Sequence, residues 1–566
     1  MRFTIQSFYV FLITIIFFGT ASAQSGKISG KVVDGSTGEA LPFVNVMVEG
    51  TTQGAATDID GYFAIIGLRP GIYNVKASAI GYNSQTVQEV RVSIDLSTEV
   101  NFELRETSIE LKEEVVIVAT RPLVTKDLTS TTAIVGADEI SVLPVTEFQE
   151  VLQLKAGIVG GNVRGGRRGE VVYAIDGVPM TVVDVSTSSI QELQFVSGAF
   201  NAEYGKALSG YVNIATKDGD NKFQGSVTSY IGDYVSDRTD IFRDIDNIDP
   251  TSIRNFEGNL SGPIIPNTMF FYLNARYIYF GGWLNGQRNY NPWNITVNRG
   301  ATEPIETRYN LSANRDGSGI GDGEIVPMNW NEKVYGQGKL TYRPFSDIKI
   351  NYNYIFDNVE YRDFDQSFSY NPDGDFKKFR VGHTNILGLT HTLSPSTFYQ
   401  ANFSYFFKQY RQFVYEDVND PRWTHDELLG QQPTEIPSFK TGGTQNQIFK
   451  RITNTYGFKL DFTSQVDKMN MVKFGIEFNQ HHLGFDNIYL RQNPSFEDPS
   501  ITLNPYVTRY IPDLLSTSEN LSIDIYEREP IELSAYLQDK LELNEMIINI
   551  GFRLDYFNSN GLVLND

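Results

Sequence analysis

Alternation of apolar and polar residues dominates the second half of the chain. In the clearest segments, residues 348–356, 472–479 and 548–556, every second residue is apolar and most of the residues between are Lys, Asn, Glu, Arg or Asp. A period of two predicts β-strands with one apolar and one polar face. Eleven such strands are predicted after Gly219, at residues 223–231, 255–263, 268–280, 332–343, 347–356, 383–393, 396–407, 451–463, 470–480, 530–543 and 546–557.

The connections between these strands alternate in length, because every second one is a short turn and the others run to about twenty to fifty residues. Membrane β-barrels have short periplasmic turns, long outer loops, an apolar outer face and a polar lumen. The pattern therefore predicts an antiparallel transmembrane β-barrel over residues 219–566, whereas a soluble sandwich or solenoid gives no reason for the alternation. Asp539 falls on the apolar face, where a bulge or a position near the membrane edge would accommodate it.

The chain begins with a pattern typical of an export signal. An apolar run at residues 8–18 and small residues at 21–23 predict a signal peptide over residues 1–23, since the run is too short for a membrane anchor. Residues 24–106 then contain short β-type runs spaced 8 to 12 residues apart, which predict a β-sandwich. Its strands are expected at residues 28–33, 44–48, 62–66, 73–79, 86–92 and 100–104.

A short segment of β-branched residues lies in the link over residues 107–121. Pro122 stops it, and it has no obvious sheet of its own. An extended unpaired segment can add as an edge strand to a partner protein, although it could also be the first strand of the domain that follows. The segment consists of Glu114, Val115, Val116, Ile117, Val118, Ala119 and Thr120.

Residues 122–218 predict a small α/β domain with glycine-rich turns. Helical spacing of apolar residues covers 145–154, with Gly157 just past its end. Apolar β-branched runs at 171–175 and 211–216 end in Asp-Gly turns and predict strands. The glycine-rich loop at 160–169 matches no phosphate-binding pattern.

Composition excludes several classes of function. The chain of 566 residues has no cysteine, so disulfides, thiolate nucleophiles and zinc–thiolate sites are absent from it. Its five histidines never form a zinc-binding motif, so we expect no metal site. We also expect no cofactor and no enzyme activity, which is what the resemblance described below implies. A net charge of -21 argues against a nucleic-acid partner.

Several motifs, in order along the chain, resemble one known family. Residues 174–179, 198–205 and 210–219 resemble the plug domain of TonB-dependent outer-membrane receptors, in which Arg164 and Gly165 fit an arginine–glycine motif. The segment from Glu114 to Thr120 resembles the TonB box, and residues 24–106 resemble the carboxypeptidase-regulatory-like domain, an immunoglobulin-like or transthyretin-like sandwich that is not catalytic.

The resemblance implies a mainly β protein that takes up an unidentified substrate through a plugged barrel in the outer membrane of a Gram-negative cell. Its sandwich would lie in the periplasm, and its partners would be outer-membrane lipid and a TonB-type energy-coupling protein. Receptors of this family close with 22 strands, so the sequence is expected to hold about half of a barrel. An adhesion or surface-structural barrel without active transport is the alternative, and a receptor that also signals inward stays open.

Charge predicts how the plug is held in place. The loop at residues 160–169 is positive, whereas predicted lumen positions of the barrel carry carboxylates. We expect an ionic latch that fixes register without a large apolar interface, although the arginines could instead meet only solvent. The predicted latch consists of Arg164, Arg167, Arg168, Asp461 and Glu477.

Overall fold

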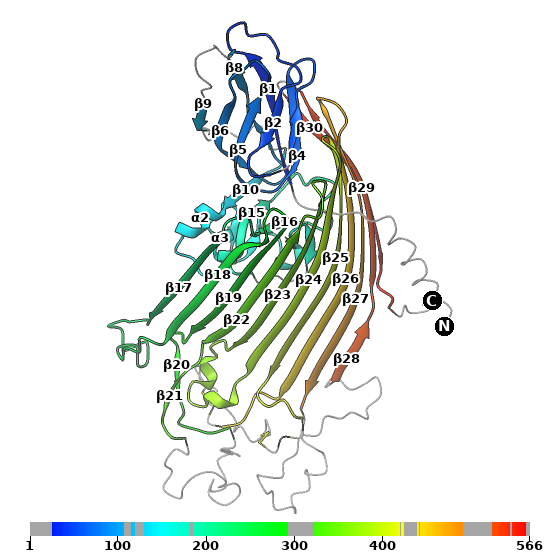
Figure 1. The fold of residues 1–566 in the computed structure, drawn as a ribbon. Helices are drawn as coiled ribbons and strands as arrows, with labels where there is room; N and C mark the ends of the chain where they lie inside the picture. The colour runs from blue at the N-terminus through cyan, green and yellow to red at the C-terminus, as the bar shows by residue number, and fades with distance from the viewer. Residues whose placement is uncertain are drawn as a thin grey trace, which may run out of the picture.

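The first unit of the structure is a β-sandwich (Figure 1). One sheet has the order β4-β1-β7 with β8 also paired to β1, and the other has the order β3-β2-β5-β6-β9. Buried Ile28, Phe63 and Phe102 fill the space between them, as the predicted alternation requires. The strands are β1 Gly26–Asp34, β2 Asn45–Val48, β3 Gly54–Ala56, β4 Tyr62–Leu68, β5 Gly71–Ser78, β6 Gln85–Val92, β7 Ser97–Glu99, β8 Phe102–Leu104 and β9 Val115–Val118.

This structure is a computed structural model. It describes residues 25–51, 53–106, 115–118, 129–180, 185–292, 321–418, 420, 422–423, 439–440, 442–490, 523–543 and 546–561. The predicted signal peptide and the predicted coupling residues Glu114, Ala119 and Thr120 lie outside these ranges.

Strand β9 corrects one expectation. The β-branched segment was predicted to have no sheet of its own, yet β9 pairs in parallel with β6, from Gln85 opposite Val115 to Gln88 opposite Val118. It is neither isolated nor the first strand of the next unit. The edge of β6 offers unpaired backbone groups, and pairing satisfies them, which sequence periodicity cannot reveal.

The second unit, called the plug unit here, is an α/β domain over residues 129–219. Its sheet has the order β10-β15-β16-β13-β14, and the predicted strands at 171–175 and 211–216 are both present. The predicted helix is shorter than expected, because a capping box formed by Glu147 and Glu150 starts it at Phe148. The elements are β10 Thr132–Gly136, α2 Ala137–Val142, α3 Phe148–Gln153, β11 Ile158–Val159, β12 Asn162–Val163, η1 Arg168–Glu170, β13 Val171–Ile175, β14 Val178–Met180, η2 Thr187–Ser189, β15 Ile190–Val196 and β16 Gly210–Thr216.

Among the described residues, no helix is long and apolar enough to cross a membrane.

The third unit is one antiparallel sheet of twelve strands. Eleven of them form a continuous path from β17 to β30, and each coincides with a predicted strand. Prediction missed β28, which pairs with the outer part of β27, because Pro530 separates it from β29. The strands are β17 Gln224–Gly232, β18 Ile253–Ile265, β19 Met269–Phe280, β22 Asn331–Tyr342, β23 Ile348–Tyr361, β24 Lys377–Ser394, β25 Thr397–Phe413, β26 Gln447–Gln465, β27 Asn470–Tyr489, β28 Ile523–Arg528, β29 Ile531–Glu542 and β30 Ile547–Asn558.

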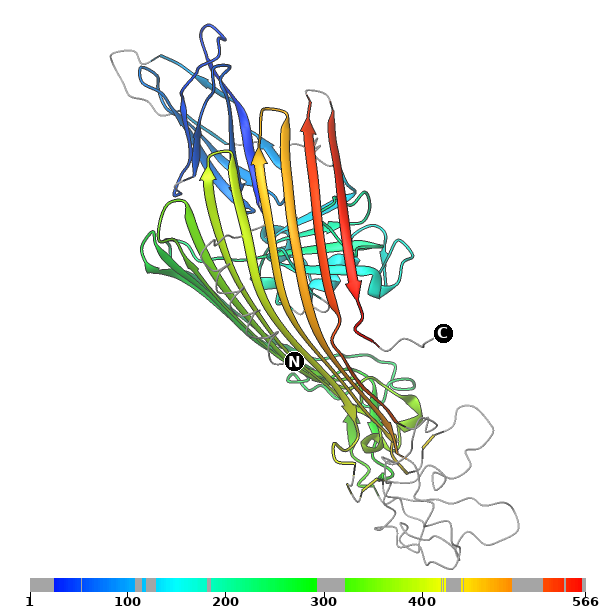
Figure 2. The same ribbon diagram turned by 90° about the vertical axis from the view of Figure 1, so that its right-hand side faces the viewer.

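The sheet curves, and its two faces differ as predicted (Figure 1; Figure 2). On the face that carries the plug unit, Asn353 and Lys473 are buried, whereas Tyr352 and Phe474 on the other face are 40% and 43% exposed. Asp539 keeps the regular register and shares the outer face with Leu537, three residues before β29 ends. Its position is therefore near the end of the strand and does not involve a bulge.

The sandwich lies at the end of the sheet where the short turns are (Figure 1). Lys468, in the turn between β26 and β27, forms ion pairs with Asp58 and Asp60 of the sandwich. The opposite end carries the long connections, which include β20 Asn285–Gln287, β21 Ile325–Pro327, η4 Gln366–Phe368 and η5 Pro372–Gly374.

Candidate functional site

A buried lysine of the sheet anchors the plug unit. Lys339, on β22, has a side chain that is 0% exposed, and its Nζ donates to Asp176 Oδ2 at 2.8 Å and to Thr216 Oγ1 at 2.7 Å. A third partner, Asp218 Oδ1, lies 2.9 Å away. A buried ammonium requires such partners, because an unpaired charge in this place would cost several kcal/mol.

The turn between β13 and β14 presents Asp176 to this lysine. Asp176 has a φ of 47° and Gly177 a φ of 86°, a tight turn that Asp and Gly tolerate. The carboxylate of Asp176 also accepts from the backbone N–H of Thr216 and from Asn353 Nδ2. Burial alone would raise the pKa of Asp176, but the charges of Lys339 and Arg69 hold it below the ordinary value.

Asp218 joins all three units at one carboxylate. It pairs with Lys339 and with Lys349 of the sheet, at 2.9 and 3.1 Å, and with Arg69 of the sandwich. Burial opposes its ionisation, yet these three cations hold the pKa of Asp218 well below its ordinary value. The carboxylate is therefore charged at neutral pH.

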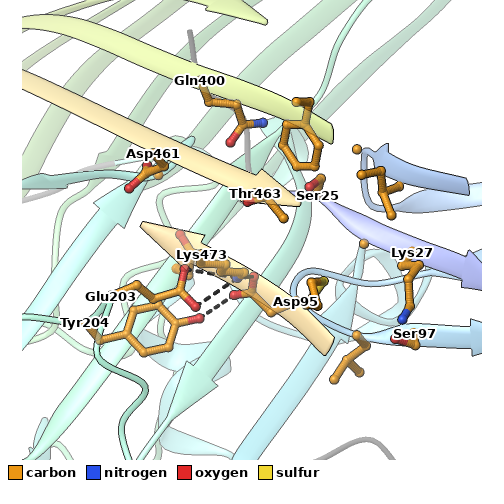
Figure 3. Close-up of a pocket in the computed structure, with 18 of the residues that line it drawn as sticks. Ser25, Lys27, Asp95, Ser97, Glu203, Tyr204, Gln400, Asp461, Thr463 and Lys473 are labelled. Carbon is orange, nitrogen blue, oxygen red and sulfur yellow. Dashed lines mark hydrogen bonds and ion pairs between the residues drawn. The ribbon is translucent and has the colours of Figure 1, made fainter. Parts of the chain in front are cut away.

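A second charged cluster also involves all three units (Figure 3). Lys473 Nζ, from β27, lies 2.7 Å from Asp95 Oδ1 of the sandwich and 3.0 Å from Glu203 Oε1 of the plug unit. Tyr204 of the plug unit donates a hydrogen bond to the same Asp95. The cluster borders a cavity of about 60 Å³, which has room for water.

Further polar contacts hold the helical side of the plug unit. Glu147, at the start of α3, pairs with Lys333 of β22 at 2.8 Å. Glu257 of β18 accepts hydrogen bonds from Ser186 and Ser188 of the plug unit and lies 3.8 Å from Arg276. The interface is thus rich in charged and polar groups, most of them shielded from solvent.

Apolar contact between sheet and plug unit includes four buried side chains of the sheet. Buried Tyr335, Ile355, Ile386 and Phe406 project from the sheet into the hydrophobic cluster of the plug unit. Most of the other buried residues on this face of the sheet are polar. Removal of the plug unit would therefore require separation of many hydrogen-bonded and charged pairs in addition to these apolar contacts.

The predicted latch is not the arrangement that the structure shows. Arg164 and Arg167 are exposed, and Arg164 lies against Gly198 of the plug unit itself. Glu477 lies 3.5 Å from Arg553, and Asp461 lies 3.3 Å from Lys459, so these carboxylates pair with cations of the sheet. The side chain of Arg168 is not among the described ones.

The local fold explains this outcome. Strands β11 and β12 pair with each other, and Arg164 has a φ of 47° with its backbone N–H bonded to the carbonyl of Gly157. This short hairpin keeps the loop within the plug unit. The anchoring residues that sequence reasoning missed, Asp176 and Lys339, carried a signal: an Asp in a plug-like motif and a Lys on the polar face of a predicted strand.

The remaining predicted site is the coupling segment, which the structure places at the edge of the sandwich as β9. Ile117 is 45% exposed there.

The part of the chain that the structure describes contains no group of three His, Asp or Glu side chains suited to a metal ion.

Comparison with known proteins supports the predicted resemblance. Residues 28–117 match the family model described as CarboxypepD_reg-like domain, a match that includes most of β9. The chain is 25% identical over 293 residues to the TonB-dependent transporter Oar of Myxococcus xanthus, covering 46% of this chain and 27% of that protein. It is 28% identical over 223 residues to the TonB-dependent receptor P26 of Formosa agariphila, covering 35% and 21%.

A solved structure is also similar in part. The outer membrane transporter YddB from Escherichia coli aligns over 75% of this chain and 56% of its own, with 11% identity and a TM-score of 0.49. The curated relatives confirm the resemblance to TonB-dependent receptors, which are transporters and not enzymes. The alignments span about a quarter of the length of these two relatives.

Proposed function

We propose that this chain, a relative of the TonB-dependent receptors, serves energised uptake of a substrate through a plugged β-barrel in the outer membrane. One observation carries the proposal: the plug unit lies on the polar, concave face of a long antiparallel sheet and contacts it through buried ion pairs such as Lys339 with Asp176. Such contacts fix one position of the plug unit, and water can solvate the separated charges once the plug unit is displaced.

In this mechanism the outer face of the sheet contacts lipid, and the substrate enters from the end with long connections. A periplasmic TonB-type protein would grip the segment from Glu114 to Thr120. Strand β9 is last in its sheet, so its second edge can accept a partner strand by backbone hydrogen bonds. The substrate is unidentified.

We divide the chain into a signal peptide, a sandwich, a plug and a barrel. The sandwich would extend to residue 118, beyond the boundary at 106 that sequence spacing suggested, because β9 completes its sheet. The plug and the barrel would meet near Asp218. An adhesion barrel, the alternative, has no need of a plug that ionic contacts hold in a removable position.

The proposal is tested with the full gene product in planar lipid bilayers, without any substrate. The intact protein should conduct almost no current, and deletion of residues 122–218 should open a steady, large pore. Equal conductance of the two forms would overturn the plugged-barrel assignment.

A purified TonB C-terminal domain should bind the intact protein, and loss of residues 114–120 should abolish that binding. Binding that survives this deletion would show that the coupling segment lies elsewhere.

A further inference from the structure

The sandwich is attached to the sheet at two turns. Lys27 and Ser97 both contact Glu542 at the end of β29, with Ser97 Oγ donating at 2.9 Å. Asp58 and Asp60 hold Lys468 in the turn after β26. The sandwich is therefore docked on the sheet and does not hang from it by a linker alone.

The sandwich also grips the plug unit through the loop at residues 93–96. Ile94 is fully buried. Its backbone N–H donates to Glu192 Oε1 at 2.8 Å, and its carbonyl accepts from Gln194 Nε2 at 3.3 Å. Two side chains of β15 thus replace the backbone partners that a neighbouring strand would supply. These hydrogen bonds fix the position of the loop on the plug unit.

The next residue of the loop shares a cation with the plug unit (Figure 3). Asp95 and Glu203 both pair with Lys473, and Tyr204 donates to Asp95. Burial would raise the pKa of Asp95, yet the charge and hydrogen bond of Lys473 hold it below its ordinary value. One lysine of the sheet therefore holds sandwich and plug unit together.

This loop is the direct continuation of the strand that holds the coupling segment. Strand β6 ends at Val92, the loop begins at residue 93, and β9 pairs with β6 along four residues. In chain order β9 also stands between the sandwich and the plug unit. A pull on β9 therefore loads the sandwich at the strand that leads into its contact with the plug unit.

We propose that the sandwich is a clamp, which a pull on the coupling segment must lift from the sheet before the plug unit can leave. The clamp consists of the sandwich with the loop at residues 93–96 and its contacts to Lys473, Glu192 and Glu542. The inference rests on the proposed function only for the source of the force. It assigns the sandwich a mechanical role, since the plug unit cannot move while this loop bridges it to the sheet.

Force spectroscopy on the full gene product in a supported bilayer tests the clamp. The handle is a cysteine introduced at Ala119, next to β9, in a chain that has no other cysteine up to residue 566. The intact protein should show two successive events, release of the sandwich and then extension of the plug unit. Asp95→Asn should lower the force of the first event. The matched control is Glu99→Gln, which should change nothing, because in the part of the chain that the structure describes the Glu99 carboxylate accepts a hydrogen bond from Asn101 of the sandwich itself.

A tether gives the decisive comparison. Ser97→Cys with Glu542→Cys joins the sandwich to the sheet, and the control pair Thr397→Cys with Ser464→Cys joins two neighbouring strands whose hydroxyls lie 2.8 Å apart. Oxidation of the first pair should remove the first event and block extension of the plug unit, and reduction should restore both. Oxidation of the control pair should leave the two events unchanged.

Two results would overturn the clamp: extension of the plug unit at the same force with the tether closed, or Asp95→Asn behaving like Glu99→Gln. If the Asp95→Asn protein does not insert into the bilayer, the Tyr204→Phe protein is used in its place. That variant removes only the hydroxyl that donates to Asp95. The pull needs neither substrate nor coupling protein. Absence of two successive events in the intact, untethered protein therefore contradicts the clamp, whereas absence of transport in a protein that shows both events contradicts only the proposed function.

Discussion

At the scale of single residues, Lys339 decides how the plug unit is seated. Its ammonium is fully buried between Asp176 and Asp218, and Thr216 supplies a hydroxyl and a carbonyl as further acceptors. A buried cation with this many partners fixes one geometry, because no other position of the plug unit would satisfy the three charges together.

Replacement of this lysine should destabilise the seated plug unit strongly. Lys339→Met keeps the length of the side chain and leaves buried carboxylates without their cation, a loss of about 3–5 kcal/mol. The full gene product should unfold at lower temperature in detergent and leak small ions in planar bilayers. Lys468→Met is the control, since its side chain is 44% exposed and solvent screens its ion pairs. Similar behaviour of the two variants would contradict this role of Lys339.

Glu192 should make the docking of the sandwich depend on pH. Burial raises its pKa to about 7 from an ordinary value near 4.5, even though Ile94 donates to it. Between these values the docked form keeps a proton that the undocked form has lost, so docking weakens as the pH rises from about 4.5 to about 7. The contribution of Glu192 to the docking free energy is at most about 3 kcal/mol. It is fully present below this pH window and is lost above it.

Asp218 gives docking the opposite pH dependence. Its pKa is held well below the ordinary value, so its contribution is present at neutral pH and is lost when the pH falls below about 4. Docking should therefore be strongest near pH 4 to 5. Spin labels on Ile80→Cys and Val142→Cys, two exposed positions, would report the docked fraction. Glu192→Gln should reduce the change between pH 4.5 and 7, and an unchanged pH profile in that variant would contradict the assignment.

At the scale of elements, β9 has two edges with separate uses. One edge pairs with β6, and the other faces no described strand. Successive backbone N–H groups of a strand point to opposite edges, so those of Val116 and Ile117 serve different partners. The sandwich can therefore hold the segment while a second protein binds it.

Two proline variants should separate these uses in the fragment 25–118, which has its own hydrophobic core. Of Val116→Pro and Ile117→Pro, the one that removes the N–H facing β6 should lower the free energy of unfolding in urea by about 1–3 kcal/mol. The other should leave it almost unchanged, since proline is tolerated at a free edge, and should abolish binding of the coupling protein to the full gene product. Equal stability of both fragments would show that β9 does not pair with β6.

At the scale of the whole molecule, the two faces of the large sheet meet different surroundings. The concave face contacts the plug unit through buried polar groups, whereas the convex face presents apolar side chains, among them Leu387, which is 46% exposed near the middle of β24. Exposed apolar residues over so many strands indicate contact with lipid.

A charge on that convex face should therefore be costly. Leu387→Arg should destabilise the membrane-inserted full gene product by about 2–4 kcal/mol, because the side chain lies far from both strand ends. Val466→Arg, in the short turn after β26, is the matched control and should cost less than about 1 kcal/mol, since it meets water. Urea unfolding in lipid vesicles measures both. Equal costs would place Leu387 outside the hydrocarbon region.

The alternating pattern by itself determined most of the fold. A period of two is a local property, so every predicted strand of the large sheet is present, and so are the strands at residues 171–175 and 211–216. The same pattern assigned the two faces of the sheet, because side chains alternate regardless of what covers them. Boundaries shifted where only a partner could extend a strand, as in β27, which runs to Tyr489 because β26 and β28 flank it.

Only the tertiary structure decided which charges meet and where the coupling segment rests. Opposite charges on plug and sheet predicted attraction between the two units. In the structure, Arg164 lies against its own unit, whereas Asp176 and Asp218 form ion pairs with Lys339. Pairing of side chains depends on register and on the three-dimensional seat of each unit, which local periodicity does not contain. The pairing of β9 with β6 within the sandwich and the contacts of the loop at residues 93–96 with plug unit and sheet are likewise contacts between parts of the chain that are distant in sequence, so local periodicity does not reveal them.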